Sequence, residues 1–99
     1  MIDRITINEE RLDNILASVK NLENALDNFK KNLNDFEKIN KYYGSKTWFK
    51  DKESYEKEEI PHIKAGVLSE DAIWNMDEEV AELIVEMEKV IKKIKKTKK

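Results

Sequence analysis

Two apolar stripes with heptad spacing, one in each half of the chain, constrain its fold more than any other feature. In both, apolar residues follow one another at alternating steps of three and four, which is the spacing of a seam between packed helices. The first stripe comprises Leu12, Ile15, Val19, Leu22, Leu26, Phe29, Leu33 and Phe36. The second comprises Ile73, Met76, Val80, Leu83, Met87, Val90 and Ile94. The pattern predicts two long helices.

The composition agrees, since the 99-residue chain has only two Gly and one Pro and 40% of its residues are charged. Such a composition favours long helices over sheet. At this length we expect a single domain over residues 1–99. The predicted fold class is all-α: a long antiparallel helical hairpin, coiled-coil-like, with a short third helix packed in the connector.

Capping residues predict the bounds of three helices, which are about 6–43, 46–59 and 70–97. Gly44 is expected to end the first helix in a left-handed conformation, which costs least for Gly. Ser45 and Ser69 are N-cap residues for the second and third helices. The capping-box spacing of Thr6 and Glu9 marks the start of the first helix.

Charge along the third predicted helix is sorted by sign. Eight acids and no Lys or Arg lie between Glu70 and Glu88, whereas seven Lys and no acids lie from Lys89 to Lys99. The first predicted helix is mildly acidic at its start and basic towards its end. Antiparallel packing brings opposite charges together and parallel packing brings like charges together, so the charges favour the antiparallel hairpin.

Aromatic residues are concentrated in the connector, which holds five of the eight in the chain: Tyr42, Tyr43, Trp48, Phe49 and Tyr55. One interpretation is a core that fills the corner of the hairpin. The other is a patch that binds a partner, because Tyr and Trp give a large contact area with little loss of entropy.

A second apolar feature lies off the seam of the third predicted helix. Trp74 and Val85 are eleven residues apart and therefore share a helix face, with Ala81 close to it. Either the short helix covers this face or another subunit does.

Two further groups of residues carry alternative functions. The lysine-rich end could attract nucleic acid or an anionic membrane, although no Arg or aromatic residue is interleaved to read or stack bases, which disfavours nucleic acid. His62, Asp51 and Glu53 could serve an enzyme or a metal site. Glu-x-x-His motifs of di-metal bundles are missing from the sequence, so we expect no cofactor and no metal.

The sequence has no Cys, which excludes disulfides, thiolate metal sites and cysteine nucleophiles. The N-terminal residues form no apolar run of signal-peptide length. No apolar stretch approaches the roughly 20 residues that span a bilayer, so no transmembrane segment is expected. We therefore expect a cytoplasmic protein.

The connector also carries a resemblance to a known family. The runs Tyr42-Tyr43-Gly44-Ser45 and Gly66-Val67-Leu68-Ser69-Glu70-Asp71, with Trp48, Asp51, Glu53 and Pro61 between them, resemble the bacterial family called domain of unknown function 4298 (DUF4298). The resemblance implies a helical cytoplasmic protein and supplies no activity. It points to five positions, with bracing of the structure as their role: Tyr43, Trp48, Asp51, Glu53 and Asp71. Glu58 and Glu59 stand where a Gly is expected in that family.

Together these features predict a non-enzymatic module that binds another protein or a second copy of itself, as a homodimer. The predicted surface combines the connector with the face of Trp74. The candidate residues, with either an interaction or a structural role, are Tyr42, Tyr43, Trp48, Asp51, Glu53, Tyr55, Asp71, Trp74 and Val85.

Overall fold

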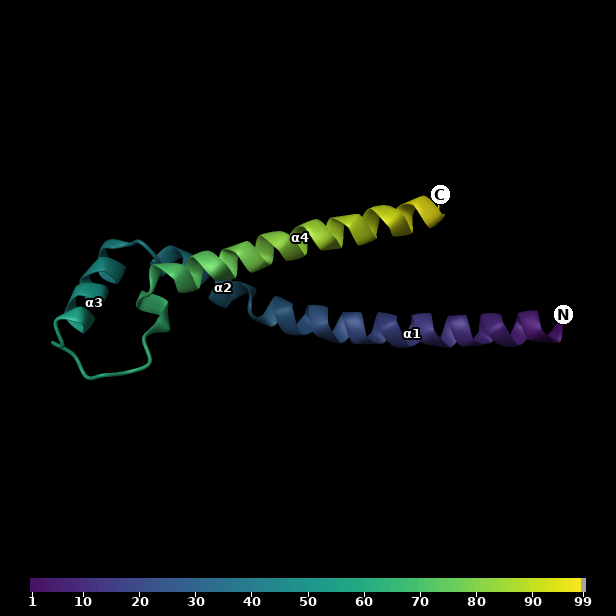
Figure 1. Cartoon of the computed structure of the whole chain (residues 1–99), viewed down its shortest axis with the longest axis horizontal. Coiled ribbons are helices and arrows are strands. Elements are labelled where there is room, and N and C mark those ends of the chain that lie inside the picture. The colour runs from purple at the N-terminus through teal and green to yellow at the C-terminus, as the bar shows by residue number, and fades with distance from the viewer. Residues whose placement is uncertain (99) are drawn as a thin grey trace. The chain divides into compact units, whose positions relative to one another are not determined.

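The computed structural model describes residues 1–98, and every regular element in that range is helical (Figure 1). The elements are α1 (Ile2–Lys31), α2 (Leu33–Tyr42), α3 (Lys46–Glu56), the 3₁₀ helix η1 (Gly66–Leu68) and α4 (Glu70–Lys98). No strand occurs within residues 1–98, which confirms the all-α class. The order of long helical segment, short helix and long helix is that of the predicted hairpin class.

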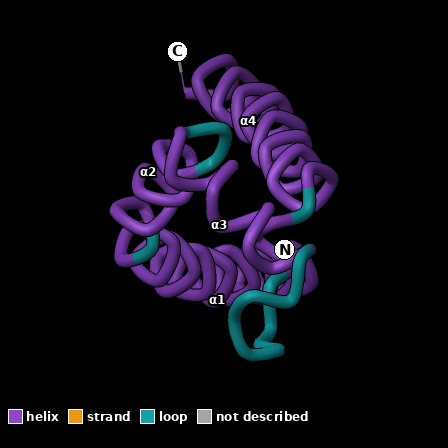
Figure 2. Tube along the Cα trace, turned by 90° about the vertical axis from the view of Figure 1, so that its left-hand side faces the viewer, coloured by secondary structure: helices purple, strands orange, loops and turns teal. Residues whose placement is uncertain are grey.

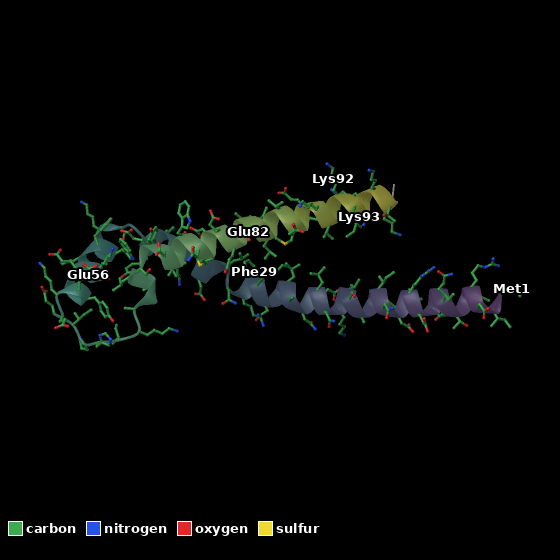
Figure 3. All side chains as sticks on the ribbon, in the orientation of Figure 1. Met1, Phe29, Glu56, Glu82, Lys92 and Lys93 are labelled. Carbon is green, nitrogen blue, oxygen red and sulfur yellow. The ribbon has the colours of Figure 1, made fainter. Side chains whose placement is uncertain are left out.

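The described chain divides into two compact units, one of residues Met1–Lys38 and one that begins at Ile39. The first unit consists of α1 and the start of α2. Helix α1 begins at Ile2, before the Thr6 that the capping-box spacing indicates, and the N–H of Ile5 donates to Met1 O at 3.1 Å. No residue of α1 is buried, and its side chains extend on all sides between Met1 and Phe29 (Figure 3).

A break at Asn32 separates α1 from α2, although the first stripe continues through it. The N–H of Asn32 donates to Phe29 O at 2.9 Å, and its Nδ2 donates to Asn28 O at 3.1 Å. Asn destabilises helix interiors because its side chain competes for backbone hydrogen bonds. The helix resumes at once, since the N–H of Phe36 donates to Asn32 O at 2.9 Å.

The turn between α2 and α3 has the chemistry that the sequence predicts. Gly44 adopts a left-handed conformation with φ 75°, a region that L side chains rarely occupy. Ser45 Oγ accepts the N–H of Trp48 at 3.1 Å and donates to Tyr42 O at 2.6 Å. One hydroxyl therefore satisfies a free amide at the start of α3 and adds a second hydrogen bond to the Tyr42 carbonyl at the end of α2, which also accepts the N–H of Ser45 at 3.0 Å.

Helix α3 ends at Glu56, three residues before the predicted bound, because the chain turns left-handed at Glu58, with φ 58°. The N–H of Glu58 donates to Tyr55 O at 3.1 Å, and the N–H of Glu59 donates to Ser54 O at 2.9 Å. These two bonds make a Schellman motif, whose left-handed position is usually occupied by Gly. An irregular segment then leads to η1 (Figure 2).

The buried core lies in the second unit, around the connector. Of residues 1–98, only Trp48, Leu68 and Ile73 are buried, and they come from α3, η1 and α4 respectively. Ile73 is the first member of the second stripe, whereas its later members from Leu83 onward are exposed. The core therefore forms where the three elements meet rather than along the stripes.

Candidate functional site

Trp48 is the centre of the connector. Its side chain is 1% exposed, and its Nε1–H donates to Val67 O at 3.0 Å. A buried indole N–H without an acceptor would destabilise the fold, so this bond allows the whole ring to be buried. It also ties α3 to η1, 19 residues further along the chain.

Two other aromatic rings pack edge-on against Trp48. Tyr43 lies with its ring centroid 5.0 Å away at 67°, and Phe49 lies at 4.9 Å and 79°. This is the geometry that aromatic quadrupoles prefer. Phe49 nevertheless remains 58% exposed, so the cluster is closed around Trp48 and open at Phe49.

Tyr42 and Asp51 join the end of α2 to α3. The hydroxyl of Tyr42 donates to Asp51 Oδ2 at 2.6 Å, and both side chains are half-buried. The hydrogen bond to Asp51, partial burial and the negative charge of Asp51 together raise the pKa of Tyr42 from 10.0 to about 12. The phenol is therefore a persistent donor, and the pair acts as a clasp between the two helices.

Lys52 links α3 to the start of α4. Its Nζ lies 5.3 Å from the centroid of the Trp48 ring, in cation–π geometry, and 3.4 Å from Glu70 Oε1. Glu70 and the exposed Asp71 lie in the first turn of α4, where the helix dipole favours anions. Lys52 thus holds the first turn of α4 against the aromatic cluster.

Tyr55 and His62 join α3 to the loop before η1. Their rings stack with centroids 5.6 Å apart and an interplanar angle of 25°, and Tyr55 Oη lies 3.3 Å from His62 Nδ1. The hydroxyl also donates to Ile63 O at 3.2 Å. These contacts fix the loop that follows the Schellman motif.

The groups considered for catalysis or metal binding fall into separate pairs. Asp51 pairs with Tyr42, His62 with Tyr55, and Glu53 with Lys57 one turn further along α3. The hydrogen bond and positive charge of Lys57 lower the pKa of Glu53. Within residues 1–98, no group of three or more His, Asp or Glu side chains is placed to hold a metal ion.

Trp74 contrasts with Trp48, because its side chain is 65% exposed on α4. It lines a shallow depression together with Asp77, Glu78 and Ala81, all within two turns of helix. Val85 continues the same side of the helix and is 50% exposed. The face of Trp74 is therefore an open aromatic surface with an acidic border.

The end of α4 is a lysine-rich surface. Five lysines line a shallow depression there: Lys89, Lys92, Lys93, Lys95 and Lys96. Lys89 forms an ion pair with Glu86 at 3.4 Å, one turn back along the helix. Figure 3 shows Lys92 and Lys93 projecting from the far end of α4. Within residues 1–98, no helix has both the length and the apolar character that crossing a bilayer requires.

Sequence reasoning missed two members of the connector. Lys52 follows Trp48 by one helical turn, and this spacing could have indicated that the two side chains meet. The acceptor for the indole of Trp48 is the backbone carbonyl of Val67, for which the sequence carries no signal.

Comparison with known proteins places this arrangement in a family. A family model described as domain of unknown function (DUF4298) matches residues 5–90, which include the first stripe, the whole connector and the second stripe as far as Val90. The match confirms the resemblance that the connector sequence carries. No curated protein and no solved structure matches the chain.

Proposed function

The chain belongs to the DUF4298 family, and we propose that this member is a non-enzymatic cytoplasmic module that binds another protein through exposed apolar surfaces of α4. The observation that carries the proposal is the contrast between its two tryptophans. Trp48 is 1% exposed, whereas Trp74 is 65% exposed. A large aromatic side chain left on a regular helix, with a polar border, is typical of an interface anchor.

The connector supports this function by positioning α4 rather than by binding the partner itself. Several connector side chains already make contacts within the connector: Trp48, Lys52, and the clasp of Tyr42 with Asp51. Such contacts hold the first turns of α4 in place, so that Trp74 is presented from a fixed helix. A contact surface on a fixed helix loses less entropy when it binds than one on a loop.

The border of the Trp74 face sets the chemistry of its partner. Asp77 and Glu78 line the depression beside Trp74, and Ala81 leaves room above the helix backbone. We therefore propose a partner that inserts an apolar side chain against Trp74 and carries Lys or Arg around it.

A site-specific photo-crosslinker tests this proposal in the cells that make the protein. With the crosslinker in place of Trp74, we expect a discrete covalent adduct that mass spectrometry identifies. Asn75 is the matched control, since it is exposed on the same turn but points about 100° away around the helix. Adducts of equal yield at positions 74 and 75, or none at position 74, would contradict the proposal.

The lysine-rich end of α4 supports a second candidate function, attachment to an anionic surface. Val90, Ile91 and Ile94 are exposed on one side of this segment, while most of the lysines occupy the other. A basic amphipathic helix of this kind binds anionic lipid interfaces. Co-sedimentation with anionic vesicles, with and without residues 92–99, tests it. Retention of binding after the truncation would rule it out.

A further inference from the structure

We propose that a second copy of this chain binds the exposed stripe of α4, with the two α4 helices antiparallel. This goes beyond the proposed function, because it names the occupant of the stripe and its register rather than the partner of the Trp74 face. The stripe is exposed from Leu83 onward, since Leu83, Met87, Val90 and Ile94 are each between 45% and 56% exposed, whereas Met76 and Val80 are half-buried. Ile84 and Ile91, beside the stripe, are also about half exposed.

Charge on α4 favours the antiparallel direction for a copy of the same helix. Residues 70–88 carry eight acids and no Lys or Arg, and residues 89–99 carry seven Lys and no acids. A parallel copy would place acid beside acid and lysine beside lysine. An antiparallel copy places each lysine-rich end beside the acid-rich part of the other helix, and like-charge contacts are thereby avoided.

The heptad positions then fix one register. In an antiparallel pair, each a position faces a d position of the other helix. With Val80 facing the partner's Val90, the neighbouring layers are Met76 with the partner's Ile94, and Leu83 with the partner's Met87. Each layer occurs twice by symmetry, so the stripe is filled by six apolar layers over roughly 28 Å of helix. Ile73, which the connector core already buries, lies outside them.

The positions that flank the layers agree with the same register. Glu79 lies beside the partner's Lys93, and Asp77 lies beside the partner's Lys98. Ile84 lies beside the partner's Ile91, which extends the apolar contact on that side. Glu86 lies near the twofold axis that relates the two α4 helices, so its neighbour across the interface is the partner's Glu86. A single pairing therefore accommodates the stripe, its flanking isoleucines and the charge sorting together.

The position of Glu86 gives a direct test of the register. The chain has no Cys, so a single introduced Cys forms a disulfide only with a second copy. We expect E86C to form a covalent dimer rapidly under mild oxidation. E82C is the matched control, because Glu82 is exposed on the same helix about 40° further from the stripe. Equal rates of cross-linking for E86C and E82C would overturn the register.

A charge exchange tests the pairing on the full-length chain by light scattering after size exclusion. We expect wild type to have the mass of a dimer, and K93E to dissociate roughly tenfold more readily because it creates two like-charge contacts. Adding E79K to K93E should restore the dimer, since it restores both pairs. Failure of this restoration would overturn the proposal.

A strict monomer at high micromolar concentration would overturn the proposal as well. That result leaves the proposed function standing if the crosslinker at Trp74 still captures a different protein. If the chain is a dimer but the crosslinker at Trp74 gives no adduct, the proposed function fails and the pairing of α4 stands.

Discussion

The indole Nε1–H of Trp48 donates to the carbonyl oxygen of Val67 across 3.0 Å. This bond joins two segments that lie 19 residues apart and completes the burial of the largest side chain in the core. Replacing Trp48 with Phe removes the donor and leaves a gap beside Tyr43. We expect W48F to lower the free energy of unfolding by about 2 kcal/mol.

Urea unfolding followed by circular dichroism measures this loss. W74F is the control, because Trp74 is exposed and its truncation to Phe should change the stability by less than about 0.5 kcal/mol. Similar losses for the two variants would mean that the indole of Trp48 does not organise the connector.

The clasp of Tyr42 with Asp51 predicts a dependence on alkaline pH. The pKa of Tyr42 is raised to about 12 in the folded chain, against 10.0 when the group is unperturbed. Its stabilising contribution is therefore complete below about pH 10 and is lost as the pH rises through about 12. We expect the difference in unfolding free energy between wild type and Y42F, about 1 kcal/mol at neutral pH, to shrink over that window.

Paired urea titrations of wild type and Y42F between pH 8 and 12 provide the measurement. Y43F serves as the control, since Tyr43 contacts Trp48 through its ring. A difference between wild type and Y42F that stays constant across this range would show that the phenol of Tyr42 does not hold its proton through Asp51.

The left-handed conformation of Glu58 predicts that this chain can be stabilised. A side chain at φ 58° is strained, while Gly is not, and the bonds of the Schellman motif come from the backbone. We expect E58G to raise the free energy of unfolding by about 1 kcal/mol. E59G should lower it, because Glu59 has an ordinary negative φ and Gly there only adds freedom to the unfolded chain. Thermal unfolding measures both effects: the midpoint of E58G should lie above that of wild type, and the midpoint of E59G should lie below it.

The hydroxyl of Ser45 makes two capping contacts, so its removal affects two helices. We expect S45A to lower the free energy of unfolding by about 1 kcal/mol or somewhat more. T47A is the matched control, since Thr47 is exposed in the same turn. Equal stability of the two variants would show that the cap contributes nothing.

Local features of the fold could be predicted where a short stretch of sequence determines them. Gly44 and Ser45 are an example, because a left-handed residue followed by an N-cap depends only on neighbouring residues. The break at Asn32 could not be predicted from the heptad pattern, since the apolar spacing continues through it. The residue type of Glu58 argues against its left-handed conformation, and the Gly that the family resemblance expects at Glu58 or Glu59 was the one signal for it.

The sequence predicted which residues belong to the candidate site better than it predicted how they are arranged. The aromatic residues of the connector fitted either a core or a partner patch. The position of the Val67 carbonyl, which depends on the path of the chain from α3 to η1, decides for a core at Trp48. For Trp74, exposure in the structure supports the other interpretation. The functional roles of all nine candidate residues stay predictions.

The sorted charges of α4 have a consequence for the energetics of recognition. Acids at the start of the helix and lysines at its end both interact favourably with the helix dipole. The segment is thus preorganised in its helical form by its own side chains. A molecule that docks on α4 therefore binds a preformed helix, so little of the association free energy is spent on coil-to-helix ordering.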